Sequence, residues 1–153
     1  MPLNERITDV DLLRAWKDKL PLHYEYTAGV AGERFLRGIK DGKILASRCR
    51  NCGKAYIPPK MYCVGCFVQI DDYREVGPVG TVEGLAESHV NFEGRRVDPG
   101  RTFAFITFKG VTGGLVHYVG GKGSKVGALV RPKFKPPEQR QGTLRDIEMF
   151  VAP

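Results

Sequence analysis

Two cysteine pairs constrain this chain more than any other feature of its sequence. All the cysteines lie in one short segment as two C-x-x-C pairs separated by ten residues: Cys49, Cys52, Cys63 and Cys66. A redox dithiol would be expected beside a βαβ pattern, which is missing here, and disulfides are rare in cytosolic proteins. The spacing C-x2-C-x10-C-x2-C is typical of a tetrahedral four-sulfur site. The pairs therefore predict a rubredoxin-like ribbon that holds zinc, with iron as the minor alternative because this geometry suits both metals.

The predicted metal is structural rather than catalytic. A catalytic zinc keeps one coordination position open, whereas four thiolates close the shell. Gly53 directly follows the first pair and suits the tight turn that such a site needs. Arg48 and Lys54 add positive charge close to a centre that would carry a net charge of about 2− with zinc.

The net charge of the whole chain limits the classes of ligand and partner that it is expected to bind. The 153 residues carry a net charge of +7, and a basic surface attracts nucleic acids, acidic lipids or phosphorylated ligands. A basic surface that serves only solubility is the alternative. The first 19 residues lack a secretory apolar segment, and no apolar run is long enough to span a membrane. We expect a soluble, cytoplasmic protein.

The order of the predicted elements gives a fold class. Apolar periodicity predicts helices over 8–20, with Leu12, Leu13 and Trp16 on one face, and over 33–40, followed by a strand over 43–49. Five further strands are expected at 73–90, 102–110, 114–121, 126–136 and 144–153. Five short strands with glycine-rich bends are typical of an OB-fold barrel. We expect a mainly β protein with N-terminal helices and a rubredoxin-like zinc ribbon followed by a five-stranded OB-fold barrel, divided as 1–42, 43–70 and 71–153.

No catalytic grouping is evident in the sequence. The three histidines, His23, His89 and His117, are scattered, and no local motif pairs one of them with a serine. The metal uses every cysteine, so no thiol remains as a nucleophile. The sequence therefore predicts no catalytic residues and no independent enzyme activity.

The complete pattern resembles a known family. Two N-terminal helices, the ribbon "RCRNCGKAYIPPKMYCVGC" and a β domain that begins "GPVGTVEG" are similar to the DUF35 family over essentially the whole chain. The resemblance implies a zinc ribbon fused to an OB-fold that binds CoA or acyl-CoA and associates with thiolase-superfamily enzymes. In archaea the family is linked to acetoacetyl-CoA thiolase and hydroxymethylglutaryl-CoA synthase. It implies a non-catalytic scaffold subunit that bridges its partners and retains acyl-CoA intermediates.

Basic residues in the last third of the chain are candidates for the CoA phosphates. A CoA molecule needs cations for its phosphate groups and an apolar slot for its pantetheine arm. The loop "GGKGSKVG" offers exposed amides and lysines, although a flexible turn with solvated lysines explains it equally well. The candidate CoA-binding residues are Lys122, Lys125, Arg131, Lys133 and Lys135.

The alternative function is the binding of single-stranded RNA or DNA. OB-folds and zinc ribbons both serve this role, and the positive charge fits it. Such proteins stack bases on aromatic side chains, and Phe103, Phe105, Phe108 and Tyr118 are available on predicted strands. The same aromatic residues could instead form the barrel core.

Overall fold

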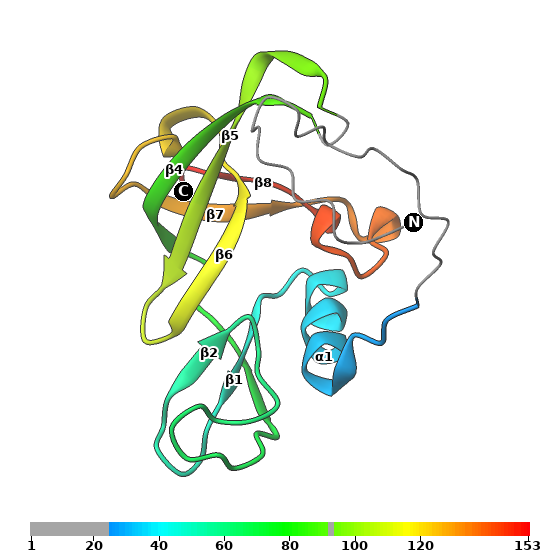
Figure 1. Cartoon of the computed structure of the whole chain (residues 1–153), viewed down its shortest axis with the longest axis vertical. Coiled ribbons are helices and arrows are strands. Elements are labelled where there is room, and N and C mark those ends of the chain that lie inside the picture. Colours follow the sequence, from blue (N-terminus) through cyan, green and yellow to red (C-terminus); the bar gives the residue numbers. More distant parts are fainter. Residues whose placement is uncertain (1–24, 92–93) are drawn as a thin grey trace, which may run out of the picture.

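The computed structural model describes residues 25–91 and 94–153. Its elements form three parts: a helix, a small ribbon and a barrel (Figure 1). The helix predicted over 8–20 lies outside the described residues. In the described part, no helix is long and apolar enough to cross a membrane.

Helix α1 (Gly29–Lys40) begins one turn before the predicted start at Glu33. Ala31, Phe35 and Ile39 are spaced by four residues and are all buried, so the apolar stripe extends one turn further than expected. The helix ends as predicted at Asp41 and Gly42, whose amides donate to the carbonyls of Arg37 and Ile39.

The ribbon sheet has three short strands. β1 (Leu45–Arg48) lies between β2 (Ala55–Ile57) and β3 (Asp72–Glu75) and pairs antiparallel with both. The single strand expected over 73–90 is therefore two strands, because the sequence Gly77-Pro78 interrupts the ladder. Its first part is β3, which joins the ribbon, and its second part is β4 (Gly80–Val90), which begins the barrel.

The barrel has the connectivity of an OB-fold. Its strands after β4 are β5 (Arg96–Phe108), β6 (Thr112–Tyr118), β7 (Leu129–Phe134) and β8 (Ile147–Val151). β4 pairs antiparallel with β5 and β7, β5 with β6, and β7 with β8. A parallel bridge between Val119 and Phe150 closes the barrel between β6 and β8. The predicted fold class, a mainly β protein with a zinc ribbon and an OB-type barrel, is confirmed.

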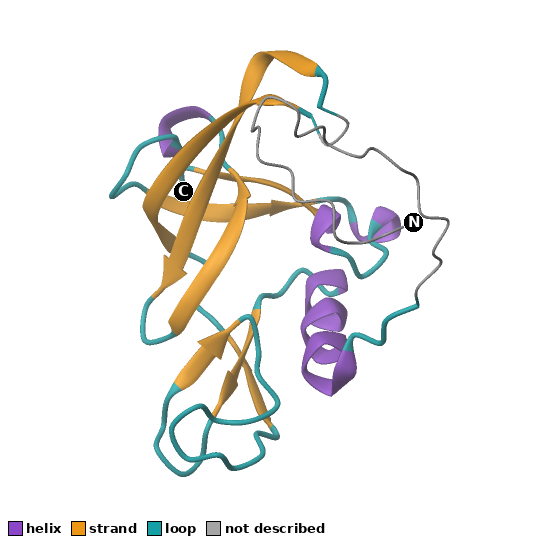
Figure 2. Cartoon of the chain, in the orientation of Figure 1, coloured by secondary structure: helices purple, strands orange, loops and turns teal. Residues whose placement is uncertain are grey.

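The ribbon and the barrel share one sheet and one core. β2 pairs in parallel with β6 through Tyr56–Thr112 and Ile57–Gly113. This pairing joins the ribbon strands to the barrel strands, all drawn in orange in Figure 2, in the order β3-β1-β2-β6-β5-β4-β7-β8. The core cluster combines residues of α1, the ribbon and the barrel: Phe35, Ile39, Ile44, Ala46, Ile57, Val82, Ala104, Ile106, Phe108, Leu115, Val119, Val130, Ile147 and Phe150. Since each such buried side chain contributes about 1.5–3 kcal/mol, the parts stabilise one another.

The parallel junction requires a glycine on the barrel side. Gly113 has φ +90°, and a Cβ at this position would overlap the carbonyl oxygen of Ile57. Neither the backbone conformation nor the space allows a side chain. The close approach of β2 to β6 therefore depends on this residue.

We expect Gly113→Ala to lower the free energy of unfolding by more than about 1 kcal/mol, because the added methyl group must push β2 away from β6. Urea denaturation measures the change. Gly84→Ala is the matched control, since Gly84 also lies in a barrel strand but has no atom within 4 Å of its Cβ position. Equal stability of the two variants would contradict the proposed junction.

A buried carboxylate holds the loop before β8. Asp146 is 1% exposed, and its Oδ2 accepts the amides of Gln141 at 3.0 Å, Gly142 at 2.7 Å and Thr143 at 3.1 Å. The loop packs against α1, where the Cβ position of Gly142 lies 3.5 Å from the carbonyl oxygen of Leu36. Burial disfavours the charged form of Asp146 and by itself would raise the pKa of the carboxyl group. The hydrogen bonds from this loop have the larger effect and lower the pKa.

Because this pKa is lower in the folded than in the unfolded chain, the stabilisation is present above about pH 4 and is lost as the pH falls below it. We expect Asp146→Asn to cost about 1–3 kcal/mol at pH 7, since a neutral amide oxygen accepts the three loop amides less strongly than a carboxylate oxygen does. The gap in stability between the two proteins should narrow between about pH 5 and pH 3, measured by urea denaturation. Loss of the metal in acid affects both proteins equally and does not change the difference in their stability. A difference that stays constant over this pH range would therefore contradict the role given to the Asp146 carboxylate.

Candidate metal centre and ligand-binding groove

The two cysteine pairs meet at the end of the ribbon. The four sulfur atoms lie within 4.8 Å of one another, and those of Cys52 and Cys63 are 3.6 Å apart. Sulfurs around a tetrahedral zinc are about 3.8 Å apart for a Zn–S bond of about 2.3 Å. Cys49 and Cys63 are buried, Cys66 is half-buried and Cys52 is exposed. The described geometry therefore fits the predicted ligand set.

The pairs form two turns of the same design. In the first, the amide of Gly53 donates to the carbonyl of Cys49 at 2.8 Å, and Gly53 has φ +74°. In the second, Phe67 donates to Cys63 at 2.9 Å and has φ +55°. Phe67 is the only non-glycine residue in the described part with a positive φ. A bulky side chain in this conformation costs of order 1–3 kcal/mol, so the turn must be held by its surroundings.

Tyr56 supports the centre from β2. Its hydroxyl lies 3.3 Å from the sulfur of Cys63. This hydrogen bond lowers the pKa of Cys63 to about 6 and, together with burial, raises the pKa of Tyr56 to about 12. The direction indicates a hydroxyl that donates to a thiolate, and the thiolate is the form that binds a metal.

The thiol of Cys66 shows why the site needs a cation. The hydrogen bond with Cys52, burial and the nearby Cys63 raise the pKa of Cys66 to about 12. Without positive charge, the four sulfurs cannot all be ionised at neutral pH. A soft divalent ion resolves this repulsion, and the all-sulfur donor set fits zinc or iron rather than magnesium or calcium. Four protein ligands leave no position for a substrate.

The second turn exposes apolar side chains around the centre. We call Tyr62, Val64, Phe67 and Val68 the knuckle patch; their exposed fractions are 56%, 56%, 81% and 39%. Residues 43–70, which include the patch, carry five cations and no acidic residue. Two of the five cations pair with acidic residues just after this segment, Arg50 with Asp71 at 3.3 Å and Lys43 with Glu75 at 3.7 Å, so the patch lies in a surface of net positive charge.

The histidines within the described residues form no nucleophile pair. His89 lies 3.5 Å from the carboxylate of Glu87. Nε2 of His117 lies 3.2 Å from the carbonyl oxygen of Leu144. Neither contact involves a hydroxyl or thiol.

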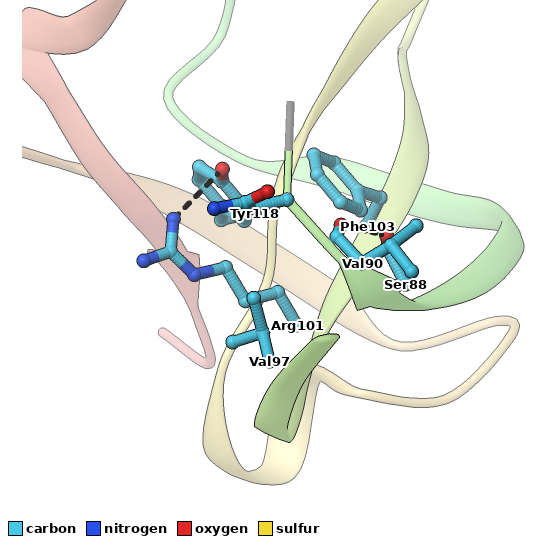
Figure 3. A pocket seen from close by; sticks show the side chains of 7 residues that line it. Ser88, Val90, Val97, Arg101, Phe103 and Tyr118 are labelled. Atoms are coloured by element: carbon cyan, nitrogen blue, oxygen red, sulfur yellow. Dashed lines mark hydrogen bonds between the residues drawn. The ribbon is translucent and has the colours of Figure 1, made fainter. Parts of the chain in front are cut away.

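A groove surrounds Tyr118 on the barrel. Three cavities of about 700, 500 and 360 Å³ have Tyr118 in their walls, and we call them together the Tyr118 groove. The first lies by the β4–β5 hairpin, the second by the loop after β6 and the third between β6 and β8. Figure 3 shows the first cavity, where the guanidinium of Arg101 reaches the hydroxyl of Tyr118. Such volumes are typical of small-molecule sites.

The structure distributes the predicted CoA-binding residues over different surfaces. Lys135 lines the third cavity of the groove. Arg131 lines a separate cavity of about 200 Å³. Lys133 is exposed and pairs with Glu148 at 2.8 Å, and Lys125 is exposed in the loop before β7. The side chain of Lys122 lies outside the described part of the structure.

The sequence reasoning missed the centre of the groove. Arg101 and Phe103 are two residues apart on β5, and Phe103 lies directly opposite Tyr118 on β6. Because side chains two residues apart on a strand share a face, the three side chains lie on one face of the sheet. The sequence patterns assign the aromatic residues only to nucleic-acid contacts or to the core. The signal for Arg101 was its position two residues before Phe103.

Comparison with known proteins gives two kinds of match. Residues 37–72 match the family model for the ChsH2 rubredoxin-like zinc ribbon domain. A Sulfolobus solfataricus protein of unknown function from the DUF35 family has 31% sequence identity and a TM-score of 0.66, over 85% of this chain and 90% of that chain. The Ltp2-ChsH2(DUF35) aldolase has 17% identity and a TM-score of 0.58, over 77% of this chain and 89% of that chain. No protein with a curated description matches this chain.

We expect Cys49→Ser to reduce the bound metal from one ion to almost none per chain and to unfold the ribbon, because binding of a structural metal is part of the folding free energy. Elemental analysis gives the metal content and distinguishes zinc from iron. Val64→Ser is the control, since Val64 lies between the cysteines of the second pair without a ligand atom. Full metal content in Cys49→Ser would contradict the four-sulfur site.

Proposed function

Because the chain belongs to the DUF35 family, we propose that it is a non-catalytic accessory subunit of a thiolase-superfamily enzyme complex. In this role it binds CoA or acyl-CoA, bridges the partner enzymes and retains the acyl-CoA intermediate. Zinc in the ribbon is structural. The observation that carries the proposal is the Tyr118 groove, which offers aromatic, cationic and apolar walls without a catalytic group beside them.

The composition of the site supports a role in binding rather than catalysis. The four-sulfur centre has no open coordination position. His117 lies at the groove but contacts a backbone carbonyl, not a nucleophile. Tyr118, Arg101 and Phe103 can hold a ligand, but none of them is paired with a general base.

The knuckle patch supports a protein partner. Exposed apolar side chains in a group are typical of interaction sites, and the surrounding cations favour a partner surface with an acidic rim. A similarly folded chain occurs in the Ltp2-ChsH2(DUF35) aldolase, whose name joins two components. The occupant that we propose for the patch is the partner enzyme.

Retention of the ligand follows from tethering. If the barrel holds the nucleotide end of acyl-CoA while the ribbon is docked, the acyl-pantetheine arm remains near the active sites of the partners. Its effective concentration there reaches the millimolar range for a short flexible link. The intermediate then passes on without release into solution.

Single-stranded nucleic acid is the second candidate ligand. Phe105 is 40% exposed on the outer face of β5, on the same side as Phe103. OB-folds use this face and adjacent cations to stack bases. Nuclease sensitivity distinguishes this function from the first.

The proposal predicts that the tagged full-length protein retains a thiolase-superfamily enzyme from native extract, with or without nuclease treatment. We expect Phe67→Asn to retain at least about 5-fold less of this enzyme, since a central apolar contact is worth more than about 1 kcal/mol. Asparagine tolerates the positive φ at this position, so the metal content should remain unchanged. Quantitative mass spectrometry measures the retained enzyme.

Val126→Asn is the matched control, because Val126 is 62% exposed but lies far along the chain in the loop before β7. It should retain the enzyme as the wild type does. Recovery of nucleic-acid-associated proteins that disappear with nuclease would favour the second function. Equal retention by Phe67→Asn and the wild type would exclude the knuckle patch as the docking surface.

A further inference from the structure

The two turns of the four-sulfur centre are equivalent position by position. In each, the carbonyl of the first cysteine, Cys49 or Cys63, accepts the amide of the residue four positions later. The amide of the same cysteine donates to the carbonyl of the residue five positions later, and each of these contacts is 2.8 or 2.9 Å long. The residue four positions after the cysteine is Gly53 in one turn and Phe67 in the other, with φ of +74° and +55°.

Glycine and phenylalanine differ in what this shared conformation costs. Glycine adopts a positive φ readily, and Gly53 has no atom within 4 Å of its Cβ position. A bulky side chain is strained in the same conformation. Phe67 is 81% exposed, so burial within its own chain does not offset the strain. The second turn is therefore less stable than a glycine would make it, and the phenylalanine serves something outside the fold.

The surfaces of the two turns are also different. The first turn presents Arg50, Asn51 and Lys54, which are polar and exposed. The second presents Val64 and Phe67, which belong to the knuckle patch. Since the backbones match, the difference lies in the side chains alone. The second turn carries an apolar surface that the design of the turn does not require.

The knuckle patch lies on one short hairpin. Tyr62 forms an antiparallel bridge with Gln69, and the amide of Ile70 donates to the carbonyl of Met61 at 2.7 Å. Phe67 lies in the turn that closes this hairpin. The ribbon loops form the end of the molecule remote from the β4–β5 hairpin (Figure 1). The barrel therefore leaves the patch accessible to a large partner.

Cations border the patch. Nζ of Lys54, from the first turn, lies 3.9 Å from the Cβ position of Gly65 in the second turn. Lys60 lies over the ring of Tyr56, 5.5 Å from its centre. Among the residues that the structure describes, no carboxylate forms an ion pair with either lysine. A partner surface that complements this arrangement has an apolar pocket for an aromatic ring and carboxylates on its rim.

We propose that Phe67 is the anchor by which the protein docks on its partner enzyme, and that docking requires a metal-loaded ribbon. Cys63 begins the turn and Cys66 directly precedes Phe67, so an ion held by both sulfurs ties the strained turn together. The ring is then fixed before the partner arrives, which lowers the entropy cost of docking. This inference rests on the proposed function and adds to it the anchoring residue and the condition for docking.

The test compares substitutions at the two equivalent positions in the full-length, zinc-loaded protein. Phe67→Gly relieves the strain and should raise the urea midpoint, whereas Gly53→Ala places a Cβ on a positive φ and should lower it. The equilibrium constant of unfolding should change at least about 3-fold in each variant, in opposite directions.

Retention of the thiolase-superfamily enzyme from native extract should not follow stability. We expect Phe67→Gly to retain at least about 5-fold less of it, measured by quantitative mass spectrometry, and Gly53→Ala to retain it as the wild type does. Phe67→Tyr keeps a ring in the same conformation and should remain within about 3-fold of the wild type. Removal of the metal with a chelator should lower retention at least about 5-fold, and added zinc should restore it.

Three results would overturn the inference. The first is unchanged retention by Phe67→Gly. The second is a loss of retention in Phe67→Gly together with a lower urea midpoint, because Phe67 would then support the fold of the turn. The third is equal retention by the metal-free and the metal-loaded wild type, which would remove the metal requirement.

The pattern of retained proteins separates this inference from the proposed function. If the wild type and Phe67→Gly retain a thiolase-superfamily enzyme equally, the accessory function stands and the anchor is wrong. If the wild type and Gly53→Ala retain a different, identified enzyme that Phe67→Gly releases, the proposed function fails and the anchor stands. The anchor is also wrong if Phe67→Gly releases no protein, or releases only proteins that disappear with nuclease, which would indicate a nucleic-acid surface.

Discussion

The repulsion among four sulfur atoms within 4.8 Å of one another is the constraint on which the rest of the structure depends. The hydrogen bond with Cys52 and burial raise the pKa of Cys66, and a divalent cation bound by the sulfurs removes this obstacle to full ionisation. The end of the ribbon that carries the sulfurs has little else to stabilise it, since the buried cluster there consists of Cys49, Tyr56, Cys63 and Ile70. A metal held by the four sulfurs would fix the turns from which β1 and β2 extend, and β2 in turn pairs with β6 of the barrel.

This chain of contacts links the four-sulfur centre to the Tyr118 groove. β6 carries Gly113 at the ribbon junction and Tyr118 at the groove, at the two ends of one strand. The core cluster runs through α1, the ribbon and the barrel without a break. A small protein that binds one ligand and one partner at once benefits from such rigidity, because the distance between its two surfaces is then fixed.

The distribution of charge separates the two surfaces. The segment 43–70 around the apolar patch carries cations only, although Lys43 and Arg50 pair with acidic residues that follow it, and the barrel mixes cations with paired acids such as Glu148. A lysine already paired with a carboxylate on the surface has less to offer a phosphate than an arginine held against an aromatic ring. Sequence counts of basic residues do not distinguish these cases, since pairing depends on neighbours from other strands.

The sequence by itself determined the elements that depend on local spacing. The C-x-x-C pairs predicted the ribbon and its ligands, apolar periodicity predicted α1, and five short strand patterns with glycine-rich bends predicted the OB-type barrel. Only the tertiary structure decided that 73–90 divides between ribbon and barrel, because the pairing partner of β3 lies more than 20 residues earlier in β1. It also decided which groups share a cavity: Arg101 meets Tyr118 and the loop 120–124 through the pairing of β5 with β6. Ligand sites of this kind arise from contacts distant in sequence, which local patterns do not specify.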